Sequence, residues 1–158
     1  MKVLFLDIDG VLNYNGCRER VDGYYFVNDD KILLLKQILD ATDAKVVLSS
    51  TWRLGWIEGW ESHKIHFEKL RDKLAEYDIH FLSRTPVLKD GYRGKEIDDW
   101  LQHWTGEPIE SFVIIDDDAD MKPYMNRLVR TSWMKGLEQK HVDKAIKMLN
   151  HTTKNKTN

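Results

Sequence analysis

Two aspartates, Asp7 and Asp9, follow directly after the apolar run Val3–Leu6 near the start of the chain. An unbroken apolar run of this kind is typical of a strand buried on both faces of a parallel sheet. The carboxylates would then lie at the carboxyl end of the strand, where open α/β sheets carry their chemistry. One carboxylate can attack phosphorus, and the other can protonate a leaving oxygen and later activate water. Two isolated acidic residues after a strand belong to a solvated turn about as often as to a functional site. The prediction therefore depends on which residues follow the other strands.

Polar residues also follow two other apolar runs. Ser49 comes directly after Val46–Leu48, and Asp116 and Asp117 come after Phe112–Ile115. A phosphoryl group needs hydrogen-bond donors as its charge develops, and Mg²⁺ prefers oxygen ligands. A lone serine or an acidic run is usually a helix cap or a solvated turn, but the position behind a buried strand favours function. The sequence therefore predicts a Mg²⁺-dependent phosphoryl site at one edge of a sheet.

The first acidic segment resembles motif I of the haloacid dehalogenase (HAD) superfamily of phosphohydrolases; it reads Asp7-Ile8-Asp9-Gly10-Val11-Leu12. The resemblance implies that Asp7 is the nucleophile, which forms a phospho-aspartate intermediate, and that Asp9 is the general acid and base. It also implies that Mg²⁺ contacts the Asp7 carboxylate and the Asp9 backbone carbonyl.

The residues after the other two strands resemble further HAD motifs. Ser49 resembles motif II, whose hydroxyl binds the phosphoryl group, and the adjacent Ser50 is a second candidate for phosphate binding. Asp116 and Asp117 resemble motif IV, the acidic pair that completes the Mg²⁺ site. By position, Asp117 is the expected metal ligand and Asp116 is expected to orient the motif III cation. Asp120 is a supporting candidate.

Motif III is a basic residue near the start of the helix that precedes the last acidic strand. The sequence offers two candidates for phosphate binding there, Arg93 and Lys95. The pair Arg93-Gly94 resembles the Lys-Gly pair of many superfamily members, which favours Arg93. The alternative for Lys95 is a solvated position on the helix.

The resemblance extends from Val3 to about Leu149 and narrows to one branch, the HAD domains of Swiss Army Knife RNA-repair proteins. Its most particular feature is the string Ser49-Ser50-Thr51-Trp52-Arg53. The branch implies a capless HAD fold, processing of a nucleic-acid end, and RNA-repair partner proteins. The chain has no kinase P-loop motif, so a role in RNA repair rests on analogy.

Strand and helix patterns alternate along the chain, which predicts an α/β, Rossmann-like three-layer sandwich with a mainly parallel five-stranded sheet. We expect a single domain over residues 1–150 and a polar, frayed tail over 151–158. The segment Ile79–Leu82 is the expected third strand. The longest insertions are Asn13–Val27, with a small hairpin near Tyr24–Val27, and Thr51–Ser62. Both are too short for more than a flap, so we expect an open site.

An open site suits a phosphate on a large molecule, such as a polynucleotide end, although small phosphoesters could also enter. Arg53 is a candidate for binding the substrate phosphate or the next one along a strand. The tryptophans Trp52, Trp56 and Trp60 could stack on bases, but their spacing also fits one packed helical stripe. The histidines follow no metal-binding spacing, and we interpret them as structural or surface residues.

The amino-acid composition alone does not indicate what class of partner or substrate the protein binds. The chain has 158 residues, a net charge of −2 and one cysteine, Cys17, so no strong basic field indicates nucleic acid. No apolar run approaches the roughly 20 residues of a membrane span, and we expect a cytoplasmic protein without a membrane partner. Two alternatives to the nucleic-acid phosphatase remain: a broad small-molecule phosphomonoesterase, and a non-catalytic module that binds phosphate or accepts a phosphoryl group.

Overall fold

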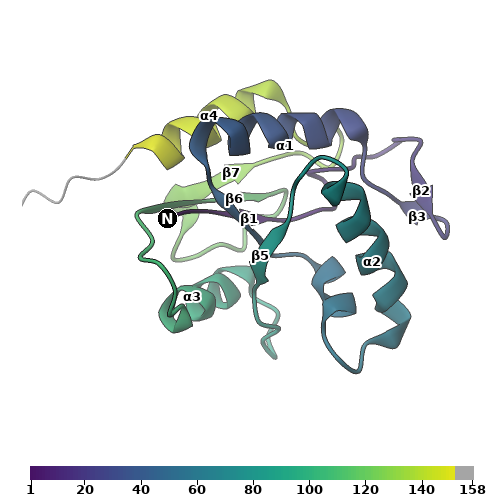
Figure 1. The fold of residues 1–158 in the computed structure, drawn as a ribbon, viewed down its shortest axis with the longest axis horizontal. Coiled ribbons are helices and arrows are strands. Elements are labelled where there is room, and N and C mark those ends of the chain that lie inside the picture. Colours follow the sequence, from purple (N-terminus) through teal and green to yellow (C-terminus); the bar gives the residue numbers. More distant parts are fainter. Residues whose placement is uncertain (152–158) are drawn as a thin grey trace, which may run out of the picture.

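A five-stranded parallel sheet forms the centre of the protein, in the order β5-β4-β1-β6-β7 (Figure 1). The computed structural model describes residues 1–151, so nearly all of the predicted polar tail lies outside the described residues. The five strands are β1 (Lys2–Leu6), β4 (Lys45–Leu48), β5 (Phe81–Arg84), β6 (Ser111–Asp116) and β7 (Leu128–Arg130). This topology confirms the predicted Rossmann-like α/β fold.

Helices cover both faces of this sheet (Figure 1). One face packs against α1 (Asp29–Thr42), α2 (Glu61–Ala75) and α4 (Gln139–Asn150), and the other packs against α3 (Arg93–His103). Two short 3₁₀ helices complete the fold, η1 (Thr51–Trp56) and η2 (Met125–Arg127). Within residues 1–151, none of the helices is both long and apolar enough to cross a membrane.

The central strand β1 is buried on both sides because its alternate residues enter two different cores. Leu4 and Leu6 belong to the core beneath α1, α2 and α4, whereas Val3 and Phe5 belong to the core over α3. All four side chains are fully buried. A strand in this position has no free edge, so the residue that follows it, Asp7, is held on a rigid base.

The strand β5 begins two residues later than the sequence predicts. The chain leaves α2 through Asp78, which adopts a left-handed conformation with φ of 56°. The backbone N–H of Ile79 then donates a hydrogen bond to the Leu74 carbonyl at 3.1 Å, and the Ile79 side chain is buried. Ile79 therefore closes the end of the helix, as apolar residues beyond a helix end commonly do, and it does not belong to the strand.

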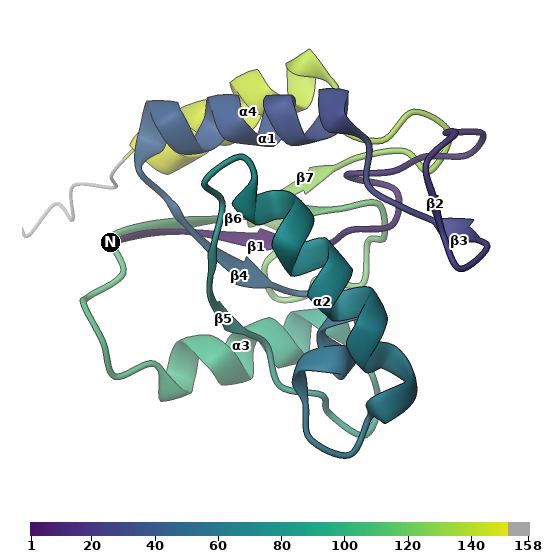
Figure 2. The same ribbon diagram turned by 45° about the vertical axis from the view of Figure 1, so that its right-hand side comes forward.

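A two-stranded hairpin, β2 (Arg20–Val21) and β3 (Tyr24–Tyr25), lies beyond the end of β1. Figure 2 shows this hairpin at the end of the molecule toward which β1 points. The Tyr24 ring contacts the His66 ring of α2 edge-on, with the ring centroids 5.5 Å apart. The predicted flap is therefore present, and it faces α2 across the region where the sequence places the site.

Candidate active site

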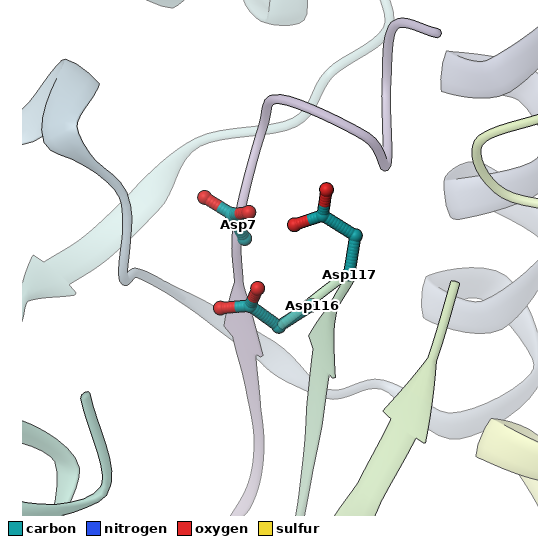
Figure 3. A group of neighbouring side chains, drawn as sticks. All are labelled: Asp7, Asp116 and Asp117. Carbon is teal, nitrogen blue, oxygen red and sulfur yellow. The ribbon is translucent and has the colours of Figure 1, made fainter. Parts of the chain in front are cut away.

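Three carboxylates meet where β1 and β6 end: those of Asp7, Asp116 and Asp117 (Figure 3). One oxygen from each lies within 4.8 Å of the others. The strands are neighbours in parallel register, with Leu6 opposite Ile115, so the residues that follow are brought together by the sheet itself. The cluster unites two of the acidic motifs that are more than a hundred residues apart in the sequence.

Burial and mutual repulsion make this cluster electrostatically unfavourable when all three groups are ionised. Burial and the Asp116 charge raise the pKa of Asp7 well above its usual range. Burial raises the pKa of Asp116 to about 7, and the pKa of Asp117 is raised for the same reason. A divalent cation would offset this repulsion, and an all-oxygen donor set suits Mg²⁺. The residues present therefore fit the metal that the sequence predicts.

Gly10 gives the Asp117 carboxylate its place in the cluster. The backbone φ of Gly10 is +80°, and a Cβ atom built there would overlap Oδ2 of Asp117. The loop is fixed on its other side by Thr131, whose hydroxyl donates a hydrogen bond to the Gly10 carbonyl at 2.6 Å. Only glycine meets both requirements, left-handed backbone and close approach, at this position.

The Asp9 carboxylate is held apart from the cluster by two donors. Trp52 Nε1 lies 3.2 Å from both of its oxygens, and Asn13 Nδ2 donates to Oδ1 at 2.9 Å. The turn after Asp7 therefore aims the Asp7 and Asp9 carboxylates in different directions. Trp52 is a positioning residue for Asp9, and the structure places it there because η1 begins immediately after β4.

Two buried donors beside Asp7 have no hydrogen-bond partner among residues 1–151: Ser49 Oγ and Arg93 Nη1. The Ser49 backbone N–H bonds the Leu6 carbonyl at 2.8 Å, which places Ser49 next to Asp7. Arg93 Nε lies 3.8 Å from Asp116 Oδ2 and Arg93 Nη1 lies 3.8 Å from Glu96 Oε2, and both distances are too long for hydrogen bonds. Buried polar atoms are rarely left unpaired, so these two donors indicate an anionic ligand. Their position fits the predicted phosphate-binding roles.

Of the two predicted motif III cations, the structure brings Arg93 to the site. The Arg93 side chain is 16% exposed and lies against Asp116. The Lys95 side chain is 62% exposed, and its Nζ pairs with Asp90 at 2.7 Å. Lys95 therefore occupies the solvated helix position that was the alternative for it.

The start of α3 is fixed by Asp120, the predicted supporting residue. Its carboxylate accepts a hydrogen bond from the Arg93 N–H at 3.2 Å, and its carbonyl accepts one from the Gly94 N–H at 2.9 Å. A Cβ atom at Gly94 would overlap the carbonyl oxygen of Lys122. The Arg-Gly pair thus lets the helix approach this loop closely enough to deliver the guanidinium.

We predict that Gly94→Ala lowers kcat/KM about tenfold to a hundredfold, because the added methyl group displaces the start of α3 and with it Arg93. Steady-state phosphate release would measure the loss. Lys95→Ala, an exposed change on the same helix, is the control and should keep kcat/KM within about twofold. An unchanged kcat/KM in Gly94→Ala would show that Arg93 does not depend on this contact.

Two other predicted phosphate ligands, Ser50 and Arg53, make protein contacts instead. Ser50 Oγ accepts a hydrogen bond from the Trp52 N–H at 3.3 Å and caps η1. The Arg53 guanidinium is buried and pairs with Glu96 at 2.8 Å. It also donates to three backbone carbonyls, those of Ser50, Thr85 and Pro86. Neither side chain is therefore placed to bind a phosphate of the substrate.

The three clustered tryptophans have three different environments. Trp52 packs partly into the core and lines a cavity beside Asp9. Trp56 stacks on Phe67 with the ring centroids 5.2 Å apart, so it is a packing residue. Trp60 is 44% exposed and contacts His63 only by its edge. Among these three tryptophans, Trp52 is the one that lines the cavity beside Asp9.

The cavity beside Asp9 has a volume of about 720 Å³ and is lined in part by residues that the sequence did not predict to be functional. Its lining includes Asp9, Thr51, Trp52 and Ser62 from the predicted motifs and insertions. The remaining lining residues are aromatic or imidazole side chains: Tyr24, Tyr25, His63, His66 and Trp133. They come from the hairpin, α2 and the loop before α4, and no sequence spacing connects them.

One family model matches the chain over residues 3–142, and it describes the HAD domain in Swiss Army Knife RNA repair proteins. No curated protein matches the chain. The match covers all the motifs described above and indicates a phosphohydrolase-type domain. The chain therefore belongs to the family of HAD domains found in Swiss Army Knife RNA repair proteins.

Proposed function

We propose that the protein is a Mg²⁺-dependent phosphohydrolase that acts through a phospho-aspartate on Asp7. The observation that carries this proposal is a pair of buried donors without hydrogen-bond partners among the described residues, Ser49 Oγ and Arg93 Nη1, beside a buried carboxylate. A phosphate ester bound to these donors would present its phosphorus to Asp7. Hydrogen-bond donors placed in advance stabilise the charge that develops on phosphoryl oxygens.

The proposed reaction has two steps, each with its own proton transfer. In the first, an Asp7 oxygen forms a bond to phosphorus as the bond to the leaving oxygen breaks, and Asp9 gives that oxygen a proton. In the second, Asp9 takes a proton from water as the water oxygen attacks phosphorus. The bond between phosphorus and Asp7 then breaks, which releases inorganic phosphate and restores the Asp7 carboxylate and the protonated Asp9 carboxyl group.

The residues proposed to hold Mg²⁺ are Asp7 and Asp117 through their carboxylates, and Asp9 through its backbone carbonyl. When bound, the ion neutralises negative charge so that a carboxylate can approach a phosphate dianion. Asp116 lies between Asp7 and Arg93, and in this proposal it orients the guanidinium. This division of roles accounts for both members of the acidic pair.

We propose a phosphate at the end of a nucleic acid as the substrate. The support comes from the family match to a domain of RNA repair proteins and from the short insertions around the site. The hairpin and η1 are the segments nearest to Asp9, and each is only a few residues long. A large substrate could therefore reach Asp7, and the other part of a repair pathway would fall to partner proteins.

The test is Mg²⁺-dependent phosphate release from oligonucleotides phosphorylated at the 3′ or the 5′ end, beside an aryl phosphate. Faster release from one oligonucleotide end supports the proposal in full. Release from the aryl phosphate alone would keep the mechanism and replace the substrate by small phosphomonoesters. Binding of these compounds without any release would favour a phosphate-binding module.

We predict that Asp117→Ala raises the Mg²⁺ concentration needed for half-maximal activity at least about tenfold and lowers kcat, because one ligand is lost. A Mg²⁺ titration of phosphate release would measure both effects. Asp118→Ala is the matched control, since Asp118 is the next residue and is exposed. A titration curve that Asp117→Ala leaves unchanged would place the metal elsewhere.

A further inference from the structure

The cavity beside Asp9 has a lining suited to a planar ring. Trp52 and Tyr25 line its walls, and two further rings are exposed to solvent, Tyr24 by 66% and Trp133 by 36%. Trp133 contacts the Tyr25 ring edge-on, with centroids 5.3 Å apart, so the loop before α4 and the hairpin meet here. Exposed aromatic side chains grouped around a cavity mark a binding surface.

The chemistry of Asp9 determines which part of a substrate would enter this cavity. In the proposed mechanism Asp9 protonates the leaving oxygen, so the leaving group lies on its side of the site. Asp9 itself lines the cavity, and Trp52 both donates to Asp9 and forms part of the wall. The cavity therefore begins where the leaving oxygen would be released.

The lining also limits the charge of the group that would bind. Among the described residues, the cavity wall includes no lysine or arginine, and its carboxylate is that of Asp9. A second phosphate there would meet the negative charge of Asp9, and the guanidinium of Arg20, which lies 3.8 Å from the centroid of the Tyr25 ring, is not part of the wall. A neutral aromatic ring, in contrast, can stack on the exposed side chains.

The polar groups in the cavity lining and the size of the cavity favour a nucleoside over a simpler ring such as phenol. Thr51, Ser62, His63 and His66 supply hydroxyl and imidazole groups to the same lining. Ser62 Oγ and His63 Nδ1 hydrogen-bond each other at 3.0 Å, and His66 Nε2 lies 3.3 Å from Asp22 Oδ2. The Thr51 hydroxyl and the other ring nitrogens of the two histidines can pair with the edge of a heterocycle or with sugar hydroxyls, and a phenol ring offers no such partners. The volume of about 720 Å³ also exceeds the needs of a single benzene ring and suits a nucleoside.

We infer that this cavity is a leaving-group pocket that holds the base of the terminal, phosphate-bearing nucleoside. The inference rests on the proposed function, and it adds that the enzyme recognises a base at the end it processes. Tyr24, Tyr25, Trp52 and Trp133 are the stacking residues. The enzyme would therefore select its substrate partly by the base on the terminal nucleoside, in addition to binding the strand.

The experiment compares two oligonucleotides with the same terminal phosphate, one on a normal nucleoside and one on an abasic sugar. The pair is made for the 3′ end and for the 5′ end. We expect kcat/KM to be about tenfold or more higher with the base present on the end that is processed. Equal values would overturn the inference and leave the proposed function standing. Release from none of the four would overturn both the inference and the proposed nucleic-acid substrate, and release from the aryl phosphate would then still support the phosphohydrolase mechanism. Faster release from a phosphotyrosine peptide than from either nucleoside would also overturn the inference.

Trp133→Ala tests the pocket itself, because Trp133 lies on a loop and is partly exposed. We expect the ratio of kcat/KM between the normal and abasic ends to fall at least about threefold in this variant. Trp133→Phe retains a ring and should preserve most of the ratio. Trp60→Ala is the matched control: Trp60 has similar exposure but does not line the cavity. A ratio that falls equally in Trp60→Ala and Trp133→Ala would contradict the assignment.

Discussion

Asp7→Asn is expected to lower phosphate release at least about a thousandfold, with the fold retained. The amide has the same shape as the carboxylate but is not a nucleophile toward phosphorus. Asp7 is 7% exposed at the end of a strand that is buried on both faces, so the site around an asparagine should keep its geometry. Initial rates with Mg²⁺ on the best substrate would measure the loss.

The same variant should not be less stable than the wild type when Mg²⁺ is absent. Burial and the Asp116 charge raise the pKa of Asp7 in the folded protein, so its ionised form opposes folding at neutral pH. Asparagine removes that charge, and thermal unfolding should show an equal or higher midpoint. Mg²⁺ should raise the midpoint of the wild type more than that of Asp7→Asn. Substantial residual turnover in the variant would contradict the assignment of the nucleophile.

Arg53→Met is expected to lower the free energy of unfolding by about 3–5 kcal/mol. The change leaves the buried Glu96 carboxylate without its 2.8 Å partner and frees three backbone carbonyls. Burial lowers the pKa of Arg53 to about 10, and the Glu96 charge opposes that shift, so the guanidinium stays charged at neutral pH. Denaturant unfolding of both proteins would measure the difference.

Two further variants show whether the loss comes from the buried charge. Arg71→Met breaks an ion pair with Asp72 in which both side chains are more than half exposed, and it should cost less than about 1 kcal/mol. Adding Glu96→Gln to Arg53→Met should recover part of the stability, since it removes a buried charge that has lost its closest partner and keeps only Arg93, at 3.8 Å. If Arg53→Met instead raised KM and cost no more stability than Arg71→Met, the phosphate contact predicted from the sequence would be correct.

The parts of the site that the sequence predicts lie where parallel strands end. Asp7 and the pair Asp116–Asp117 each follow a run of buried apolar residues, and neighbouring parallel strands must end at the same edge. Ser49 follows from the same argument on β4. At these positions the local sequence and the geometry of a parallel sheet lead to the same prediction, which does not depend on contacts between distant segments.

The parts that the sequence does not predict depend on contacts between distant segments. Arg53 lies four residues after Ser49 in the sequence, which suggests a shared ligand. In the structure, however, η1 directs the Arg53 guanidinium toward Glu96, which is forty-three residues from Arg53 in the sequence. The cavity beside Asp9 joins the hairpin, α2 and the loop that carries Trp133. The hairpin and the loop are short, and the α2 residues that line the cavity lie near the start of that helix. The lining residues of the three segments share no periodic pattern that could reveal a common site.

The most direct test of the central claim is to trap the phosphoryl group on Asp7. Asp9→Asn with an aryl phosphate is suited to this, because the leaving phenolate needs little protonation while hydrolysis of the intermediate still needs the missing base. Rapid quenching and mass spectrometry should find about one phosphoryl group per enzyme on Asp7, with a matching burst of phenol. Steady turnover with no phosphoryl group on the protein, or a phosphoryl group on another residue, would contradict the account.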